Sequence, residues 1–153
     1  MVIFNNDFKF AFNIEPPLKE LKKEGYSVLG LNASQAERVL NAFVELNSEN
    51  KIVRTIVLMK DAEFKNAKEY DERVKTNIVT MVRMGYKILA SYHMTFSNGR
   101  SAEKIIYEVN GKKLCCILCG VHGTLVGSSV VIGSEGDAYD KELSSLFASI
   151  TEF

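Results

Sequence analysis

The amino-acid sequence predicts an α+β fold in which an antiparallel β-sheet packs against one long helix and a shorter C-terminal helix. Three observations support this prediction. Apolar residues recur at helical spacing over residues 62–84, the spacing changes to alternation after Gly85, and turn residues then separate short apolar runs. A length of 153 residues fits one domain, so we expect residues 1–153 to form a single globular domain.

The long helix is predicted from its start and stop signals as well as from its period. Asp61 is a candidate N-cap, because its side chain can accept a hydrogen bond from an unpaired amide of the first turn. Gly85 suits the left-handed residue that commonly follows a helix, and Arg83 would complement the helix dipole. The apolar positions at helical spacing are Ala67, Tyr70, Val74, Ile78, Met81 and Val82.

After Gly85 the sequence predicts a meander of four antiparallel strands. Asn-Gly and His-Gly pairs mark the tight turns, because their residues tolerate positive φ. The expected strands and the turns between them are 88–97, Asn98 with Gly99, 105–109, Asn110 with Gly111, 114–121, His122 with Gly123, and 125–132. We expect Ile88, Ala90, Tyr92, Met94 and Phe96 to share one face, which Ile105, Tyr107 and Val109 continue. A closing helix is expected over residues 139–150, capped by Ser134 or Asp137.

The N-terminal part gives local signals of different kinds. Strict alternation over residues 8–14 predicts a strand, and Pro16 with Pro17 suits the first turn of a short helix ending near Gly25. A further strand is expected over residues 26–31.

Residues 34–46 carry two competing signals. Ser34 and Glu37 match a capping box, which favours a helix. Alternation of Leu40, Ala42, Val44 and Leu46 favours a strand that would form a hairpin with residues 52–59. Both alternatives stay open, with a slight preference for the strand.

The charges balance overall but not along the chain. The sequence holds 19 basic and 19 acidic residues, which argues against a general nucleic-acid or membrane-surface binder. Residues 1–50 hold 5 basic and 7 acidic side chains, residues 51–113 hold 13 and 7, and residues 114–153 hold 1 and 5. The gradient indicates either solvated faces with intramolecular ion pairs or a polarised surface that orients a partner.

The residues that could carry chemistry are few. Cys116 and Cys119 form a C-x-x-C, but strand alternation would point them to opposite faces, so we expect buried, inert cysteines and no metal site. His93 falls on the more polar face of its strand, and His122 adjoins a turn. No nucleotide-binding or hydrolase motif is present, so the sequence assigns no catalytic residue and no cofactor.

The order of elements and several short segments are similar to a known fold family. Those segments are Glu69 with Tyr70, residues 85–88 (GYKI), 98–102 (NGRSA), 106–111 (IYEVNG) and 146–150 (LFASI). Over about residues 44–150 the chain resembles the PsbP-like fold family, which includes the bacterial DcrB-like proteins. The resemblance implies an α/β/α sandwich that works by binding, since such proteins serve as photosystem subunits, small-GTPase partners or chaperones. It implies no shared catalytic residues.

The leading functional hypothesis is therefore a non-enzymatic domain that binds another protein, as an adaptor, chaperone or immunity-type factor. The alternative is a small thiol- or histidine-dependent enzyme, or a small-ligand-binding protein, that uses Cys119, His122 or His93. An exposed sheet edge would also allow a homodimer. Without a visible targeting signal or membrane span, and with clustered free cysteines, we expect a cytoplasmic location.

Overall fold

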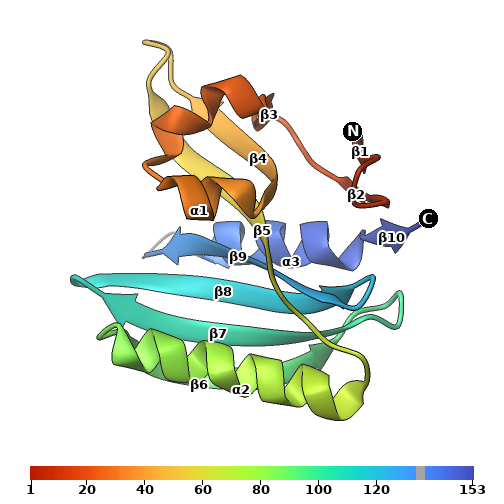
Figure 1. The fold of residues 1–153 in the computed structure, drawn as a ribbon. Coiled ribbons are helices and arrows are strands. Elements are labelled where there is room, and N and C mark those ends of the chain that lie inside the picture. The colour runs from red at the N-terminus through yellow and green to blue at the C-terminus, as the bar shows by residue number, and fades with distance from the viewer. Residues whose placement is uncertain (134–136) are drawn as a thin grey trace.

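The computed structural model describes residues 1–133 and 137–153, which form two antiparallel sheets with helices packed against the larger one (Figure 1). The elements in chain order are β1 (Val2–Asn5), β2 (Phe10–Asn13), β3 (Lys19–Leu21), the 3-10 helix η1 (Lys23–Leu29), α1 (Ala33–Glu37), β4 (Val39–Leu46), β5 (Ile52–Glu63), α2 (Ala67–Arg83), β6 (Lys87–Thr95), β7 (Ser101–Val109), β8 (Lys112–Val121), β9 (Thr124–Ile132), α3 (Asp137–Ala148) and β10 (Thr151–Glu152). The larger sheet has seven strands in the order β3-β4-β5-β9-β8-β7-β6, and the smaller has the order β1-β2-β10. The predicted α+β fold is confirmed.

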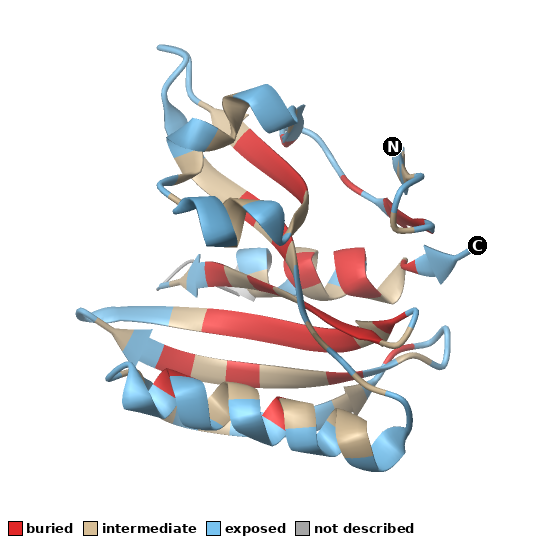
Figure 2. Ribbon diagram, in the orientation of Figure 1, coloured by how far each residue is buried: buried red, intermediate tan, exposed pale blue. Residues whose placement is uncertain are grey.

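The larger sheet separates two hydrophobic cores, which makes the molecule an α/β/α sandwich. One core lies under α2 and includes Val74 and Met81 of that helix. The other lies on the opposite face, where Leu143 and Phe147 of α3 pack with Phe10 of β2. Figure 2 shows buried residues running along β8 between these two layers. Because β8 is covered on both faces, its sequence is a continuous apolar run and not an alternating one.

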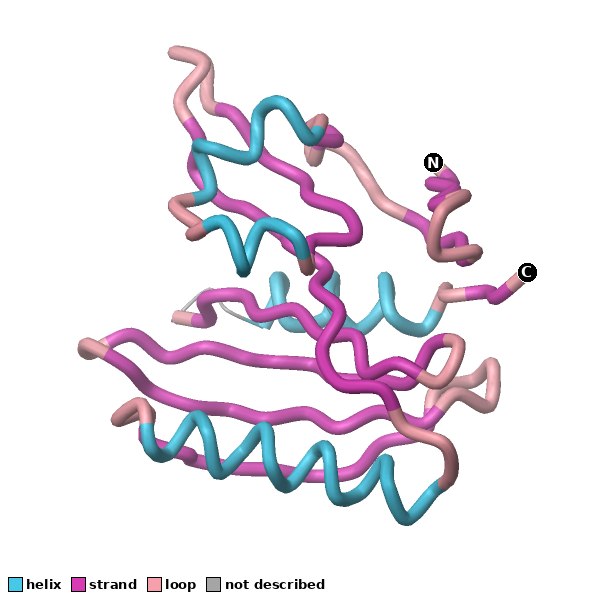
Figure 3. Tube along the Cα trace, in the orientation of Figure 1, coloured by secondary structure: helices cyan, strands magenta, loops and turns pink. Residues whose placement is uncertain are grey.

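The predicted four-strand meander is confirmed as β6 to β9. Asn110 and Gly111 have φ of 52° and 75°, and His122 and Gly123 have φ of 51° and 69°, so both residues of each of these two turns are left-handed. In the β6–β7 turn only Gly99 is left-handed, with φ of 84°, and Asn98 is not. Figure 3 shows that the loops gather at the two ends of the meander. One of these ends also holds the C-terminal strand β10 (Figure 1).

The apolar face expected to run along β6 and into β7 is wrong from Ala90 onward. Ile105, Tyr107 and Val109 pack in the core under α2, whereas Met94 and Phe96 pack in the core on the α3 side. The pairing of β6 with β7 shifts register between Ile88 and Ala90, so one extra residue, Leu89, is inserted there. Ile88 consequently packs in the core under α2 together with Tyr107, whereas Met94 packs in the core on the α3 side. The extra residue moves every later side chain of β6 to the opposite face of the sheet from the one that the pairing of Ile88 implies. The alternation of apolar residues along the chain gave no sign of this bulge.

The long helix begins later than predicted. It starts at Ala67, and its N-cap is Asn66, whose side chain accepts a hydrogen bond from the amide of Glu69. Asp61 instead lies in β5, which continues to Glu63 because its last part pairs with β9. The predicted end is confirmed, since the helix stops at Arg83 and Gly85 has φ of 90°.

Both signals in residues 34–46 are present, one after the other. The helix α1 spans Ala33–Glu37, and the strand β4 follows at Val39–Leu46 and pairs with β5. The capping box uses Asn32 and Gln35, not Ser34 and Glu37. The helical signal therefore belonged to a helix two residues earlier than expected.

The N-terminal predictions are only partly correct. The strand within residues 8–14 is confirmed as β2, but β1 was not predicted, and residues 16–25 do not form a helix from Pro16. Pro17 disfavours the helical conformation of the residue before it, and residues 19–21 pair with β4 as β3. The strand predicted at 26–31 is wrong as well, because η1 continues to Leu29 and Gly30 ends it at φ of 69°.

The closing helix is confirmed as α3, which ends at Ala148, two residues before the predicted end. Of its two suggested caps, Ser134 lies outside the described residues, as does the side chain of Asp137. None of the helices in the described ranges combines the length and apolar character needed to cross a membrane.

Candidate functional site

The three cysteines lie on β8 and are buried and free. Cys115 and Cys119 belong to the core on the α3 side, whereas Cys116 belongs to the core under α2, so the C-x-x-C pair points to opposite faces as predicted. Burial raises the pKa of Cys115 and of Cys119 to about 12, and that of Cys116 to about 11. All three thiols are therefore protonated near neutral pH and are poor nucleophiles.

His93 lies on the edge strand β6 and is exposed, as predicted. Its ring Nδ1 is 2.7 Å from the Oε1 of Glu103, which stands opposite on β7. The side chain of His93 is 56% exposed and that of Glu103 only 13%, so the carboxylate holds the imidazole from the inner side. The remaining ring nitrogen is left to contact water or a ligand.

His122 occupies the first position of the turn between β8 and β9. Its Nε2 lies 2.6 Å from the carbonyl oxygen of Lys9. Because a carbonyl oxygen only accepts hydrogen bonds, Nε2 must carry the hydrogen. Its Nδ1 faces the Oε2 of Glu152 at 3.8 Å. His122 therefore ties the N-terminal part of the chain to the C-terminal strand, and neither Cys119 nor His93 is among its contacts.

A large hollow lies at the end of the meander where β10 also lies. We name it the turn-end pocket. It has a volume of about 750 Å³ and is open to solvent. Its lining comes from the β5–α2 connection, the start of α2, β6, the β6–β7 turn, the end of β8 and the C-terminal segment, namely Phe64, Ala67, Tyr70, Asp71, His93, Asn98, Gly99, Arg100, Ser101, Gly120, Ile150, Thr151 and Glu152.

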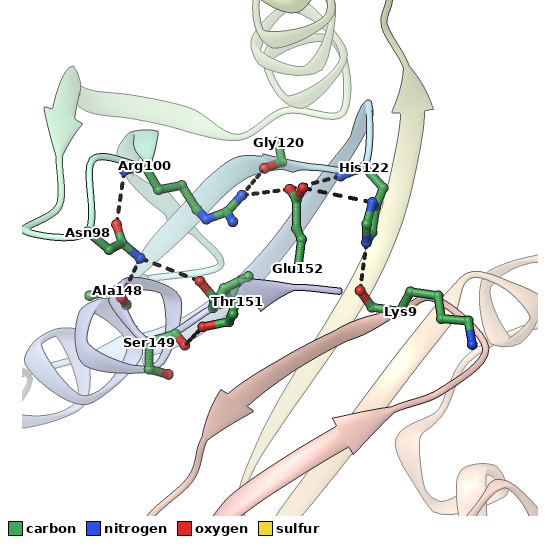
Figure 4. Close-up of polar contacts among 10 residues, drawn as sticks. Lys9, Asn98, Arg100, Gly120, His122, Ala148, Ser149, Thr151 and Glu152 are labelled. Carbon is green, nitrogen blue, oxygen red and sulfur yellow. Dashed lines mark hydrogen bonds and ion pairs between the residues drawn. The ribbon is translucent and has the colours of Figure 1, made fainter.

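Arg100 organises the polar side of the turn-end pocket (Figure 4). Its Nη1 donates to the carbonyl oxygen of Gly120 and to the Oε1 of Glu152, the latter at 3.2 Å. Its own backbone amide donates to Asn98 Oδ1 at 2.9 Å, and the Asn98 amide group donates to the carbonyl oxygen of Ala148 at 2.6 Å. The β6–β7 turn is thereby joined to the end of α3 and to β10.

Glu152 receives two kinds of donor at this site. Partial burial alone would raise the pKa of its carboxyl, but the hydrogen bond from the His122 amide, at 3.1 Å, and the neighbouring Arg100 guanidinium outweigh that effect. The pKa of Glu152 therefore lies below its ordinary value. The carboxylate is ionised at neutral pH and holds β10 in place.

Two aromatic rings belong to the lining of the pocket. The rings of Phe64 and Tyr70 meet edge to face with centroids 5.2 Å apart. Phe64 lies directly over Gly120, where an added Cβ would come within 2.5 Å of the ring. A glycine at this position of β8 is thus required by the close approach of the ring. Burial, and the nearby carboxylate of Glu103, raise the pKa of Tyr70, so its hydroxyl is a donor at all ordinary pH values.

The pocket presents several hydrogen-bonding groups to its interior. The Nε of Arg100 and the hydroxyl of Tyr70 are buried and have no hydrogen-bond partner within the described residues. Asp71 and Glu152 supply acceptors on the same lining, and no cysteine belongs to it. Across the described ranges, no group of three or more His, Cys, Asp or Glu side chains is arranged to hold a metal ion.

Of the three residues predicted as alternatives for chemistry, only His93 lines the turn-end pocket. His122 lies just outside it, and Cys119 lies beneath it in the core. Sequence reasoning did not identify Arg100 or Glu152. The signal that could have found them is the charge gradient, since Arg100 belongs to the basic segment and Glu152 to the acidic tail.

Comparisons with known proteins agree on the fold. Over 100% of this chain and 92% of the other, the structure is similar to that of cyanobacterial PsbP (CyanoP) from Synechocystis sp. PCC 6803, with a TM-score of 0.60 and 11% sequence identity. A crystal structure from Bacteroides thetaiotaomicron VPI-5482 is similar with a TM-score of 0.57 and 11% identity, over 99% of this chain but only 48% of that one. No family model and no curated sequence matches the chain.

The structural likeness reaches beyond the resemblance seen in the sequence, which covered residues 44–150, and includes the N-terminal part. At 11% identity it concerns the fold and not the activity. The chain therefore has a PsbP-like fold, as its sequence predicted.

Proposed function

We propose that this chain is a non-enzymatic binding domain whose partner is a protein, acting as an adaptor, chaperone or immunity-type factor. The observation that supports it is the position of the turn-end pocket beside a free sheet edge. β6 is the last strand of the larger sheet, and within the described residues no strand pairs with its outer side. His93 belongs both to this strand and to the pocket lining, so edge and pocket are continuous.

An extended partner segment suits this arrangement. Added to the edge of β6, such a segment would satisfy the outward backbone groups of that strand. Leu89 and Tyr92 are 42% and 48% exposed on β6 and would contact its side chains. The end of the segment would reach the turn-end pocket, where Arg100 and Tyr70 can donate to its carbonyl oxygens. The balanced net charge favours a protein over nucleic acid or a membrane surface as this partner.

The buried cysteines support this proposal over a thiol-dependent enzyme. Such an enzyme needs an accessible thiolate next to a base. Here the three thiols have raised pKa values and lie within packed strands. We also retain the cytoplasm as the proposed location, where free thiols stay reduced.

Site-specific photocrosslinking in the native cell tests the proposal. A photoreactive phenylalanine analogue replaces Ser91 on β6 in one version of the protein and Ser48, in the β4–β5 connection, in the other; both serines are exposed. We expect one discrete adduct from position 91 and none from position 48. Equal labelling from both positions, or no adduct from position 91, would overturn the proposal. An adduct between two copies of the chain would identify the edge as a homodimer contact instead.

His93 also favours a second candidate, a small-ligand-binding protein. This imidazole lines the turn-end pocket together with Arg100 and Tyr70. For this function, replacing His93 by Gln should weaken binding of a compound found by thermal-shift screening. The matched change Ser91→Ala, on the same strand but outside the pocket lining, should leave its affinity unchanged. Equal affinities of H93Q and the parent protein would exclude this use of the pocket.

A further inference from the structure

A second hollow lies between α2 and β5, separate from the turn-end pocket. We name it the α2 cleft. Its volume is about 480 Å³, within the range of small-molecule sites, and it shares no lining residue with the turn-end pocket. β8 and β9 contribute its floor through Cys116, Leu118 and residues 127–129, and Arg38 at the end of α1 borders it.

One end of the α2 cleft is positively charged. Arg38 and Arg73 line it with a single carboxylate, that of Asp61. Lys60 borders the cleft too, but it pairs with Val126 of the α3-side core, so its side chain lies on the other face of β5. Asp61 is already engaged, because it accepts a hydrogen bond of 2.7 Å from Asn77 and lies 3.9 Å from Arg38. The Nε of Arg73 donates to the carbonyl oxygen of Glu63, which fixes the guanidinium at this end. Arg73 takes part in no ion pair among the described residues, so its positive charge remains uncompensated in the cleft.

The other end of the α2 cleft is apolar and adaptable. Val57, Met59, Met81 and Met84 line it, and three of the five methionines of the chain are therefore gathered in this one cleft. Methionine side chains are flexible and polarisable, so they adjust to the shape of an apolar ligand.

The two ends are arranged along one axis. β5 leads into α2 through a short connection, and the contacts of Asp61 with Asn77 and of Glu63 with Arg73 show that the helix runs back along the strand. Arg73 therefore lies at one end of the cleft and Met84 at the other, about 16 Å apart along the helix at about 1.5 Å per residue. The polar end of an elongated ligand would contact Arg73, and its apolar end would contact Met84.

We propose that the α2 cleft binds a small amphiphilic anion, with a carboxylate or phosphate head at Arg73 and an apolar body along the methionines. The head complements the uncompensated charge of Arg73, and the body displaces water from Met59, Met81 and Met84. This site is independent of the proposed protein-binding function and would stand if that function were disproved.

The methionines provide the test. In the full chain labelled with ¹³C at the methionine methyl groups, we expect titration with decanoate to shift the signals of Met59, Met81 and Met84 in a saturable way. The signals of Met1 and Met94, which do not line the cleft, should stay unchanged. Decyl phosphate in a parallel titration distinguishes a phosphate head from a carboxylate head. Decanol and decyltrimethylammonium share the apolar body but lack the negative charge, so each should bind at least about tenfold more weakly.

A matched pair of variants locates the head group. Arg73→Gln removes a charge from the cleft, whereas Lys75→Gln removes one from an exposed position of α2 outside it. We expect R73Q to weaken decanoate binding about fivefold and K75Q to leave it unchanged. Equal shifts of all five methionines, equal affinity for decanol, or equal effects of the two variants would overturn the proposal.

Discussion

The change Glu152→Gln tests how much the charge of the Glu152 carboxylate contributes to the stability with which β10 is held in the fold. The Glu152 carboxylate is contacted by Arg100 at 3.2 Å and by the His122 amide at 3.1 Å. Glutamine keeps the shape and one acceptor oxygen but removes the charge. The side chains of Arg100 and Glu152 are 17% and 38% exposed, so solvent partly screens the pair. We expect a loss of about 0.5–1 kcal/mol in the free energy of unfolding at pH 7, which lowers Tm by about 1–4 °C in a chain of this length.

The pH dependence of this loss makes the prediction specific. The pKa of Glu152 is lowered in the folded protein, so the unfolded chain binds the proton more tightly. The stabilisation that the Glu152 charge provides is therefore complete above the pKa of this carboxyl in the unfolded chain, ~4.3. It is lost as the pH falls through the lower pKa of the folded protein. Calorimetric Tm values of the parent protein and of E152Q should differ at pH 7 and converge as the pH approaches 3.

Glu49→Gln is the matched control for this experiment. Glu49 also has a basic partner, Lys51 at 3.5 Å, but the two side chains are 70% and 76% exposed. E49Q should leave Tm unchanged at every pH. A difference between the parent protein and E152Q that persists at pH 3 would show that the carboxylate charge is not its cause. Equal Tm values at pH 7 would show that the ion pair does not stabilise the fold.

Three further predictions concern the core and the helices. The three buried thiols should not react with a disulfide reagent at pH 7.5 until the protein unfolds, because burial keeps them protonated. Reaction of the native protein at the rate of a free thiol would contradict this prediction. Gly127→Ala should lower the free energy of unfolding, measured by chemical denaturation, by about 1–3 kcal/mol, because the new Cβ would lie 2.6 Å from a core leucine. The control Gly133→Ala has no described atom within 4 Å of its new Cβ, so it should change that free energy by less than about 0.5 kcal/mol. Asn66→Ala should lower the free energy of unfolding by about 1 kcal/mol, because it removes the side chain that caps α2, whereas Asn66→Asp keeps a capping oxygen and should retain the stability of the parent protein. Equal stabilities of the two variants would refute the capping role.

The parts of the fold that were predicted correctly are those specified by neighbouring residues. The meander follows from turn pairs such as Asn110 with Gly111, whose positive φ values the structure confirms. The end of α2 follows from Gly85 in the same way. Each of these signals acts within two or three residues, so no knowledge of the rest of the chain is needed to interpret it.

Two of the errors occur where a distant strand decides the local structure. Asp61 is of a residue type that often caps helices. It stays in an extended strand because the residues just before it pair with β9, Met59 with Gly127 and Lys60 with Val126. The bulge at Leu89 likewise depends on the register with β7 and not on the residue itself. Such non-local pairing overrides local propensity and cannot be read from spacing alone.

The turn-end pocket was largely invisible to sequence reasoning for a related reason. Its polar residues come from segments about fifty positions apart, as the contacts of Asn98 with Ala148 and of Arg100 with Glu152 show. No motif spacing relates such positions. His93 was identified as a candidate only because it is one of two histidines, and the structure adds the reason for its position, the Glu103 carboxylate beside it.

The charge gradient along the chain is partly neutralised within the fold. Three cations of the basic segment pair with the acidic flanks: Arg54 with Glu45 and Glu142, Arg100 with Glu152, and Lys104 with Asp140. Their side chains are only 13–17% exposed, so these pairs lie where strands and helices from different parts of the chain meet.

This pairing also narrows the search for a partner surface. Charge that is already matched within the fold cannot attract a partner strongly, because its field is largely cancelled at short range. Arg73 is different, since it lines the α2 cleft and forms no ion pair within the described residues. The α2 cleft therefore offers unmatched positive charge to a partner, and the R73Q and K75Q pair tests that location directly.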